Sequence, residues 1–134
     1  MIAENIIVQG TGKDITAEWV WNYFRDVDSF DPENVVKHYT EDGQFRFGNQ
    51  EPARGKAAIA QMLSEFYKNL QSMSHRNVGL WLGDNSAVFE AEVTFTRKTG
   101  DRIVLPAASI IRRRGELVED FRMIMDGSPL LKSS

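Results

Sequence analysis

Apolar and polar positions alternate along the second half of the chain, from residue 74 to residue 126, with three interruptions. The interruptions are Gly83-Asp84-Asn85-Ser86, Lys98-Thr99-Gly100-Asp101 and Arg113-Arg114-Gly115-Glu116. The flanking runs are rich in Val, Ile, Phe and Thr, a pattern typical of successive β-hairpins. It predicts four long antiparallel strands joined by turns that each have two central residues.

The first half of the chain has helical spacing instead. Asp14 or Thr16 is suited to cap a first helix, and Asp31-Pro32-Glu33 is suited to begin a second that reaches about Tyr39. A strand at residues 44–47 precedes a third helix from residue 56 to about 70. Residues 1–13 are a lead-in with a short strand at 6–8, and residues 14–131 form one domain. The order predicts an α+β fold, with three helices packed on the concave face of a cone-shaped antiparallel sheet.

Two-residue turns would align the side chains of the four strands in rows. One face then has apolar outer rows and charged middle rows, and we expect it to form the floor of a cup beneath the helices. The predicted pocket residues come from this face and from the helices: His75, Asn77, Trp81, Glu90, Ser109, Trp19, Tyr23, Tyr39 and Phe66. A bulge at Pro106, which cannot donate to a ladder, would place Ala108 instead of Ser109 in the cup.

The other face of the predicted sheet is more uniformly apolar. Three helices can cover only one face, and an exposed face this apolar exceeds what monomers usually present to water. We therefore expect a homodimer through this face, with contacts from Phe89, Val93, Phe95, Ile110, Phe121 and Met123. The alternative exchanges the two assignments, so that the helices pack on the apolar face and the charged face meets water.

Composition limits the function classes further. The 134 residues are 42% hydrophobic and 26% charged, and they carry a net charge of −3. These values are typical of one globular domain and give no bulk electrostatic case for binding nucleic acid. Cysteine is absent, no run approaches the roughly 20 apolar residues of a membrane span, and the first ten residues do not resemble a signal peptide. We expect a cytoplasmic protein without membrane partners.

The predicted cup suggests acid–base chemistry on a mostly apolar small molecule. Asp120 and Glu90 share a row, and two carboxylates in a dry pocket cannot both ionise freely. Asp120 is the expected base for removing a proton beside a carbonyl. Arg122 and Glu92, in the next row, would orient the substrate or stabilise charge; their alternative is a structural ion pair. His75 is either a proton shuttle or structural. The two histidines lack metal-ligand spacing, so neither metal nor cofactor is expected.

Several local patterns resemble the nuclear transport factor 2-like superfamily and, within it, the SnoaL-like proteins. The matching segments are residues 45–49 with Pro52 and residues 55–59, residues 93–97 with Gly100, Leu105-Pro106, and residues 121–126 with 128–130. The resemblance covers about residues 14 to 131. It implies a cone-shaped pocket between helices and sheet, and often a dimer.

The resemblance also allows enzyme motifs to be compared position by position. Ketosteroid isomerase would have its base near Phe47 and its acid near Ser109 or Ala108, and none of these is a carboxylic acid. In relatives of limonene-epoxide hydrolase, the charged catalytic positions correspond to Glu92, Thr94 and Arg122 of this chain. SnoaL-type cyclases imply an Asp near Arg122, and Asp120 is the nearest match. Isomerase, cyclase or hydrolase chemistry therefore stays open, as does a non-catalytic module for ligand binding or dimerisation.

Overall fold

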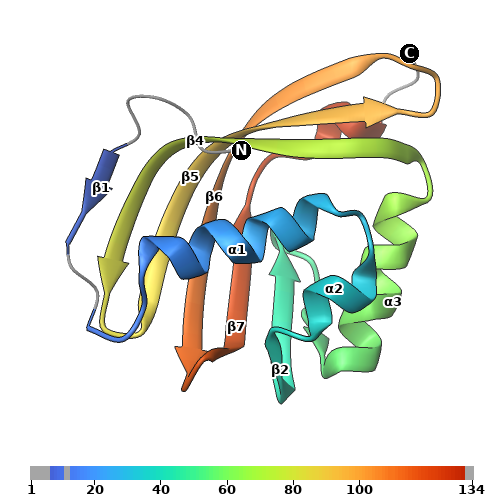
Figure 1. The fold of residues 1–134 in the computed structure, drawn as a ribbon. Helices are drawn as coiled ribbons and strands as arrows, with labels where there is room; N and C mark the ends of the chain where they lie inside the picture. Colours follow the sequence, from blue (N-terminus) through green and yellow to red (C-terminus); the bar gives the residue numbers. More distant parts are fainter. Residues whose placement is uncertain (1–6, 11–12, 132–134) are drawn as a thin grey trace.

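The computed structural model describes residues 7–10 and 13–131, which form three α-helices and one seven-stranded sheet (Figure 1). The strands follow the order β1-β4-β5-β6-β7-β2-β3 across the sheet. In chain order the elements are β1 (Ile7–Gln9), α1 (Ala17–Asp28), α2 (Pro32–Val36), β2 (Tyr39–Phe47), β3 (Ala53–Arg54), α3 (Lys56–Tyr67), β4 (Leu70–Gly83), β5 (Ser86–Arg97), β6 (Arg102–Arg114), β7 (Leu117–Ile124) and a 3₁₀ turn, η1 (Ser128–Leu131). The predicted α+β class is confirmed.

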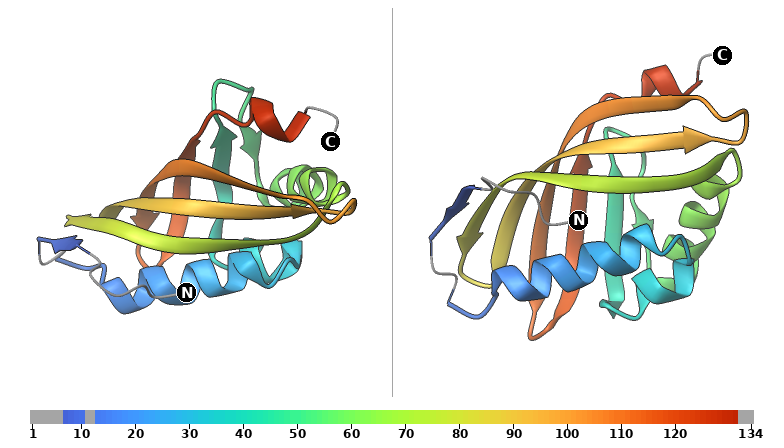
Figure 2. Two further views of the ribbon diagram at one scale, coloured as in Figure 1. Left: turned by 90° about the horizontal axis from the view of Figure 1, so that it is seen from above. Right: turned by 45° about the horizontal axis from the view of Figure 1, so that its top comes forward.

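The sheet is mixed, whereas the sequence predicted a wholly antiparallel one. β4, β5, β6 and β7 form the predicted antiparallel meander, but β1 runs parallel to β4 and β2 runs parallel to β7. The predicted strand at residues 6–8 corresponds to β1, although Ile6 lies outside the described residues. The sheet curves around α1, and α2 and α3 lie at one end of it (Figures 1 and 2).

The helix starts follow the local signals in the sequence. Thr16 Oγ1 accepts a hydrogen bond from the Trp19 N–H at 3.1 Å, and Asp31 Oδ1 accepts one from the Glu33 N–H at 3.0 Å. The helix ends differ from the prediction, because β-pairing begins earlier than expected. Tyr39 is the first residue of β2 and Leu70 is the first residue of β4.

The β5–β6 hairpin differs from its predicted register by one residue. The Arg97 N–H donates to the Asp101 carbonyl at 2.9 Å, and the Gly100 N–H donates to the Arg97 carbonyl at 2.8 Å. The turn therefore has three central residues, and Gly100 takes the left-handed position with a φ of +95°. Side chains in a strand alternate between faces, so one additional turn residue moves all of β5 to the opposite face relative to β6.

Irregularities in β4 and β7 also change the predicted register of the sheet. The β4–β5 pairing shifts between Asn77 and Gly79, and the β6–β7 pairing shifts where Arg112 and Arg113 meet β7. His75 and Asn77 consequently keep their predicted inner positions, whereas Trp81 lies on the outer face. Its ring covers Gly79, where a Cβ atom would lie 2.6 Å from the Trp81 ring.

Neither predicted assignment of the two sheet faces therefore holds as a whole. The carboxylates Glu90, Glu92 and Asp120 lie on the outer face, as in the alternative that exchanges the faces. His75, Asn77 and Ser109, which were expected on the same face as these carboxylates, are instead buried on the inner face.

The helices cover the apolar face: Phe24 of α1 contacts Phe89 at a centroid distance of 4.4 Å, and Tyr23 contacts Phe121 at 5.7 Å. Most of the predicted dimer contacts are instead in this interior, namely Phe89, Val93, Phe95, Phe121 and Met123. The exception, Ile110, pairs with Val88 and Arg122 on the outer face.

Candidate functional site

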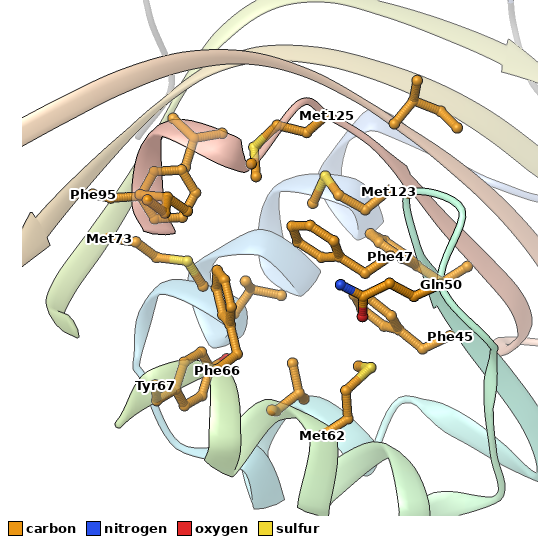
Figure 3. A pocket seen from close by; sticks show the side chains of 18 of the residues that line it. Phe45, Phe47, Gln50, Met62, Phe66, Tyr67, Met73, Phe95, Met123 and Met125 are labelled. Carbon is orange, nitrogen blue, oxygen red and sulfur yellow. The ribbon is translucent and has the colours of Figure 1, made fainter. Parts of the chain in front are cut away.

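A cavity of about 1070 Å³ lies between the helices and the inner face of the sheet. Its walls are mostly aromatic and aliphatic, and they come from every layer of the fold (Figure 3). α1 contributes Phe24, and the other principal wall residues are Phe45, Phe47, Met62, Phe66, Met73, Phe95, Phe121, Met123 and Met125. Size and lining are those of a small-molecule site, in which apolar walls surround a few polar groups.

Methionines are concentrated in this lining. Four of the five methionines of the chain, Met62, Met73, Met123 and Met125, line the cavity, and Figure 3 shows their side chains among the aromatic rings. A methionine side chain is unbranched and polarizable, so it adjusts to ligands of different shape and contacts aromatic rings favourably. The walls are therefore suited to a flat or aromatic apolar molecule.

The mouth of the cavity is more polar than its walls. Asn49 and Gln50 follow β2, and on the other side Asp126 precedes η1 and Ser128 begins it. Arg97 Nη1 donates to the Leu130 carbonyl at 3.4 Å and its Nη2 lies 2.7 Å from Asp101 Oδ2, which ties η1 to the β5–β6 turn. Access from solvent therefore passes between the loop after β2 and the C-terminal segment.

One ionisable pair reaches the cavity wall from two elements. His75 of β4 lines the cavity, and its Nδ1 lies 2.7 Å from Oδ1 of Asp28, the last residue of α1. The backbone N–H of His75 donates to the other Asp28 oxygen, Oδ2, at 3.3 Å. A carboxylate can only accept, so Nδ1 carries a proton, and in the neutral tautomer that this bond selects the lone pair is on Nε2.

Two tyrosines form a second polar pair deeper in the core. The hydroxyl oxygens of Tyr23 and Tyr39 are 2.7 Å apart, and both side chains are fully buried. Burial raises the pKa of Tyr23, which the hydrogen bond with Tyr39 offsets only in part. Burial likewise raises the pKa of Tyr39. Both hydroxyls therefore stay protonated over the physiological range; of the two residues, Tyr23 lines the cavity.

A third tyrosine, Tyr67 at the end of α3, also lines the cavity. Its ring stacks on Phe30 at a centroid distance of 4.1 Å, and its hydroxyl is buried without a hydrogen-bond partner among the described residues. Burial raises the pKa of Tyr67, and the negative charges of Asp28 and Asp31 raise it further.

The sequence-predicted pocket residues divide into three groups. His75, Tyr23 and Phe66 line the cavity as expected. Asn77, Ser109, Trp19 and Tyr39 lie on the interior side but are not part of the lining, and Ser109 donates to Met123 Sδ at 3.8 Å. Glu90 and Trp81 are exposed on the outer face, so their predicted pocket positions are wrong.

The three predicted catalytic residues also lie outside the cavity. Glu92 pairs with Arg76 across β4 and β5 on the outer face, where both side chains are about half exposed, at 45% and 59%. Asp120 accepts from Gln44 Nε2 at 3.0 Å, from Arg122 Nε at 3.1 Å and from Arg112 Nη1 at 3.2 Å. Asp120 thus lies in a polar network on the outer face, where its partners leave its side chain 13% exposed. The predicted row of Asp120, Ser109 and Glu90 does not form. The longer turn between β5 and β6 places Phe89 opposite Ser109, and the β6–β7 pairing places Met123 opposite it on the other side.

The described residues limit two other kinds of site. Within 7–10 and 13–131, no three His, Asp or Glu side chains are grouped so that they could hold a metal ion. No helix in that part of the chain is long and apolar enough to cross a membrane.

Comparison with known proteins identifies the family. The model of the SnoaL-like domain matches residues 20–121, which include most of α1, the sheet from β2 to most of β7, and every wall of the cavity except its C-terminal segment. The chain belongs to the SnoaL-like domain family. A comparison with curated protein sequences finds no match.

Solved structures resemble this SnoaL-like domain over most of its length. A hypothetical protein with a ketosteroid isomerase-like fold from Catenulispora acidiphila, in complex with trimethylamine, is 15% identical with a TM-score of 0.73 and covers 81% of this chain and 85% of its own. A putative SnoaL-like polyketide cyclase from Jannaschia is 12% identical with a TM-score of 0.74, covering 90% and 95%. TerC co-crystallised with polyporic acid is 15% identical with a TM-score of 0.73, covering 85% and 93%. At these identities the likeness establishes the fold.

Two polar residues of this SnoaL-like domain were not predicted from the sequence as site residues. Asp28 ends α1, where the helix dipole disfavours a negative charge; an acid in that position is a signal that it has a tertiary partner, here His75. Tyr67 belongs to the apolar stripe of α3, with Ile59 and Leu63. Nothing in its local sequence distinguishes a tyrosine with a bonded hydroxyl from one whose hydroxyl is unpaired.

Proposed function

We propose that this SnoaL-like domain binds a mostly apolar carbonyl compound in the cavity and removes a proton beside the carbonyl, with His75 as the general base. The observation that carries the proposal is the His75–Asp28 pair in the wall of an otherwise apolar cavity. Asp28 fixes the ring by accepting from Nδ1, which leaves Nε2 as the atom that can take a proton.

The proposed step needs no cofactor. Nε2 takes the α-proton, the electron pair of the C–H bond moves into the carbon framework, and the carbonyl becomes an enolate. Return of the proton from Nε2 to a different carbon completes an isomerisation. In an aldol-type cyclisation the enolate carbon attacks a second carbonyl within the substrate, and the resulting alkoxide takes the proton from Nε2. The family model and the cyclase-named structural neighbours support these two classes.

Small-molecule binding has separate support. Two structurally similar proteins are described in complex with trimethylamine and with polyporic acid. The volume and apolar walls of the cavity are those of a ligand site. A non-catalytic ligand-binding domain is the alternative function, and it predicts binding without proton transfer.

Deuterium exchange tests the proposed base without knowledge of the natural substrate. The probe is 2-acetonaphthone in D₂O, whose methyl protons beside the carbonyl are followed by ¹H NMR. We expect the protein to accelerate their loss, and His75→Gln to lower the rate by about 10²- to 10⁴-fold or to the uncatalysed background. Glu92→Gln, on the outer face, is the matched control and should exchange at the wild-type rate. An unchanged rate in His75→Gln would exclude His75 as the base.

We also propose that the domain forms a homodimer, through the outer face of the sheet. Apolar side chains there are partly exposed in adjacent strands: Trp81 at 40%, Val88 at 37% and Ile124 at 52%. Trp81, Val88 and Ile110 lie next to one another across three strands and border a hollow of about 300 Å³. The outer ion pairs would form the polar rim that surrounds the apolar centre of an interface.

Light scattering after size-exclusion chromatography tests the dimer. Val88→Lys places a charge in the centre of the outer face and should convert the dimer to a monomer. Ala58→Lys, on the exposed side of α3, should leave the mass unchanged. A wild-type monomer at about 100 μM, or a Val88→Lys dimer, would contradict the proposal.

A further inference from the structure

The Tyr67 hydroxyl is the one described tyrosine hydroxyl in the cavity lining that has no protein partner. The side chain is 7% exposed, and the hydroxyl oxygen is buried without any hydrogen bond. Tyr23, the other tyrosine of the lining, bonds to Tyr39 at 2.7 Å. A buried polar group without a partner is costly and uncommon in a folded protein, so such a group in a cavity wall indicates a bond that a ligand completes.

The neighbouring Asp28 makes its hydrogen bonds to His75 and none to Tyr67. Asp28 is close enough for its charge to act on Tyr67, yet its two oxygens accept from the ring and the backbone of His75. Packing holds the phenol in place independently, because Phe30 stacks on one side of the ring at 4.1 Å. The phenol ring is thus held by apolar contacts in the lining of the cavity that also contains the proposed base, and its hydroxyl proton is unused.

The charges of the lining restrict what can accept that proton. No lysine or arginine among the described residues lines the cavity, and its carboxylates, Glu65 and Asp126, lie at exposed positions. A ligand carboxylate buried there would lose its hydration without gaining a counter-charge. A neutral ketone or quinone oxygen has a far smaller cost and accepts from a phenol well.

We propose that Tyr67 donates a hydrogen bond to the carbonyl oxygen of an uncharged ligand, and that the cavity selects such ligands over carboxylates. This assignment extends the proposed function, because the same oxygen carries the negative charge when His75 removes the α-proton. A donor placed at that oxygen stabilises the enolate more than the ketone. The high pKa of Tyr67, caused first by its burial, keeps the hydroxyl protonated as a donor. Figure 3 shows Tyr67 beside Phe66 in the cavity wall.

A carbonyl-labelled probe reports the bond directly. We would bind 2-acetonaphthone, ¹³C-labelled at the carbonyl, to the wild-type protein, Tyr67→Phe and Tyr39→Phe, and record the carbonyl stretch and the ¹³C shift. The wild type and Tyr39→Phe should lower the stretching frequency and move the ¹³C signal downfield, and Tyr67→Phe should abolish both changes. The affinity of Tyr67→Phe for the ketone should fall by about 2- to 10-fold.

Two probes test whether the cavity selects uncharged ligands over carboxylates. 2-Naphthoate has the same ring system with a carboxylate in place of the ketone, and at neutral pH it should bind at least about tenfold more weakly than 2-acetonaphthone. Equal carbonyl signals in wild type and Tyr67→Phe would overturn the hydrogen bond, and equal affinity for the two probes would overturn the selection. A Tyr67-dependent carbonyl signal without deuterium exchange would support this inference while the proposed base fails. Deuterium exchange without a Tyr67-dependent carbonyl signal would support His75 as the base and overturn the hydrogen bond from Tyr67.

Discussion

The two faces of the curved sheet carry the same kinds of polar residue in different surroundings. On the inner face, His75 and Asp28 have side chains that are only 2% and 18% exposed. On the outer face, Arg76 and Glu92 are paired just as closely but are 59% and 45% exposed. Exposed ion pairs contribute little to stability, because water and salt weaken the attraction between their charges. The difference indicates that removal from water, rather than the pairing of an acid with a base, distinguishes the site.

Position relative to the helices decides which face is removed from water. Inner residues such as Phe89 pack against α1, so the few polar groups among them are desolvated. Outer residues in the same strands alternate with them and meet solvent. Substitutions that affect one face and leave the other unchanged can therefore test this contrast.

The largest effect should come from identical substitutions on the two sides. Leu80→Ala removes a fully buried side chain and should lower the free energy of unfolding by about 3–5 kcal/mol, through lost burial and the cavity left behind. Leu117→Ala removes a side chain that is 40% exposed and should cost less than about 1 kcal/mol. Urea unfolding measures both values. Similar losses would mean that the outer position is as tightly packed as the inner one.

Replacing equivalent acids on the two faces should separate their chemistry. Asp28→Asn removes the acceptor that fixes the Nδ1 proton of His75, so part of the general-base contribution is lost. We expect deuterium exchange of 2-acetonaphthone to slow by about 10- to 100-fold, or about 1.4–2.7 kcal/mol. Asp120→Asn changes a carboxylate of the outer network and should alter the rate less than about twofold. A larger loss of rate in Asp120→Asn than in Asp28→Asn would instead support Asp120 as the base, as predicted from the sequence.

The fold could be predicted because its signals are local. Thr16 and Asp31 cap helices by contacts within three residues, and the turn at Asp84-Asn85 has the two central residues expected. Register could not be predicted in the same way. A third turn residue before Asp101 and the irregularities near Val78 and Glu119 each move later side chains to the other face, and nothing in the alternating pattern identifies them.

The site was only partly predictable for the same reason. His75 lies before the irregularity in β4, so its inner position followed from the pattern. Glu92 and Asp120 lie on strands whose register had shifted, so they are on the outer face, Glu92 half-exposed and Asp120 covered by its polar partners. Asp28 reaches His75 across 47 positions of sequence, and only its unfavourable place at a helix C-terminus indicated a partner.

Two tyrosine substitutions should have effects of opposite sign on stability. Tyr67→Phe removes a buried hydroxyl without a partner and should raise the free energy of unfolding by about 1 kcal/mol. Tyr39→Phe removes one member of the bonded pair with Tyr23 and should lower it by about the same amount. Thermal unfolding of the ligand-free proteins measures both. A loss of stability in Tyr67→Phe would imply that its hydroxyl has a partner in the free protein.

The smallest effect belongs to the exposed surface and depends on pH. Hydrogen bonding to the Arg114 guanidinium lowers the pKa of Asp42 to about 2 in the folded chain, compared with about 3.9 in an unfolded one. A depressed folded-state pKa contributes stability above the unfolded value, and that contribution is lost as pH falls from about 4 toward 2. Asp42→Asn should therefore show a shallower decrease of melting temperature over this range than the wild type. The difference should shrink in about 0.5 M NaCl, because both partners meet solvent and salt screens them. If wild type and Asp42→Asn lost stability in parallel at low salt, the Asp42–Arg114 pair would not cause the acid sensitivity. The buried carboxylates would then cause it, and the two faces would differ in their contribution to stability as well as in their chemistry.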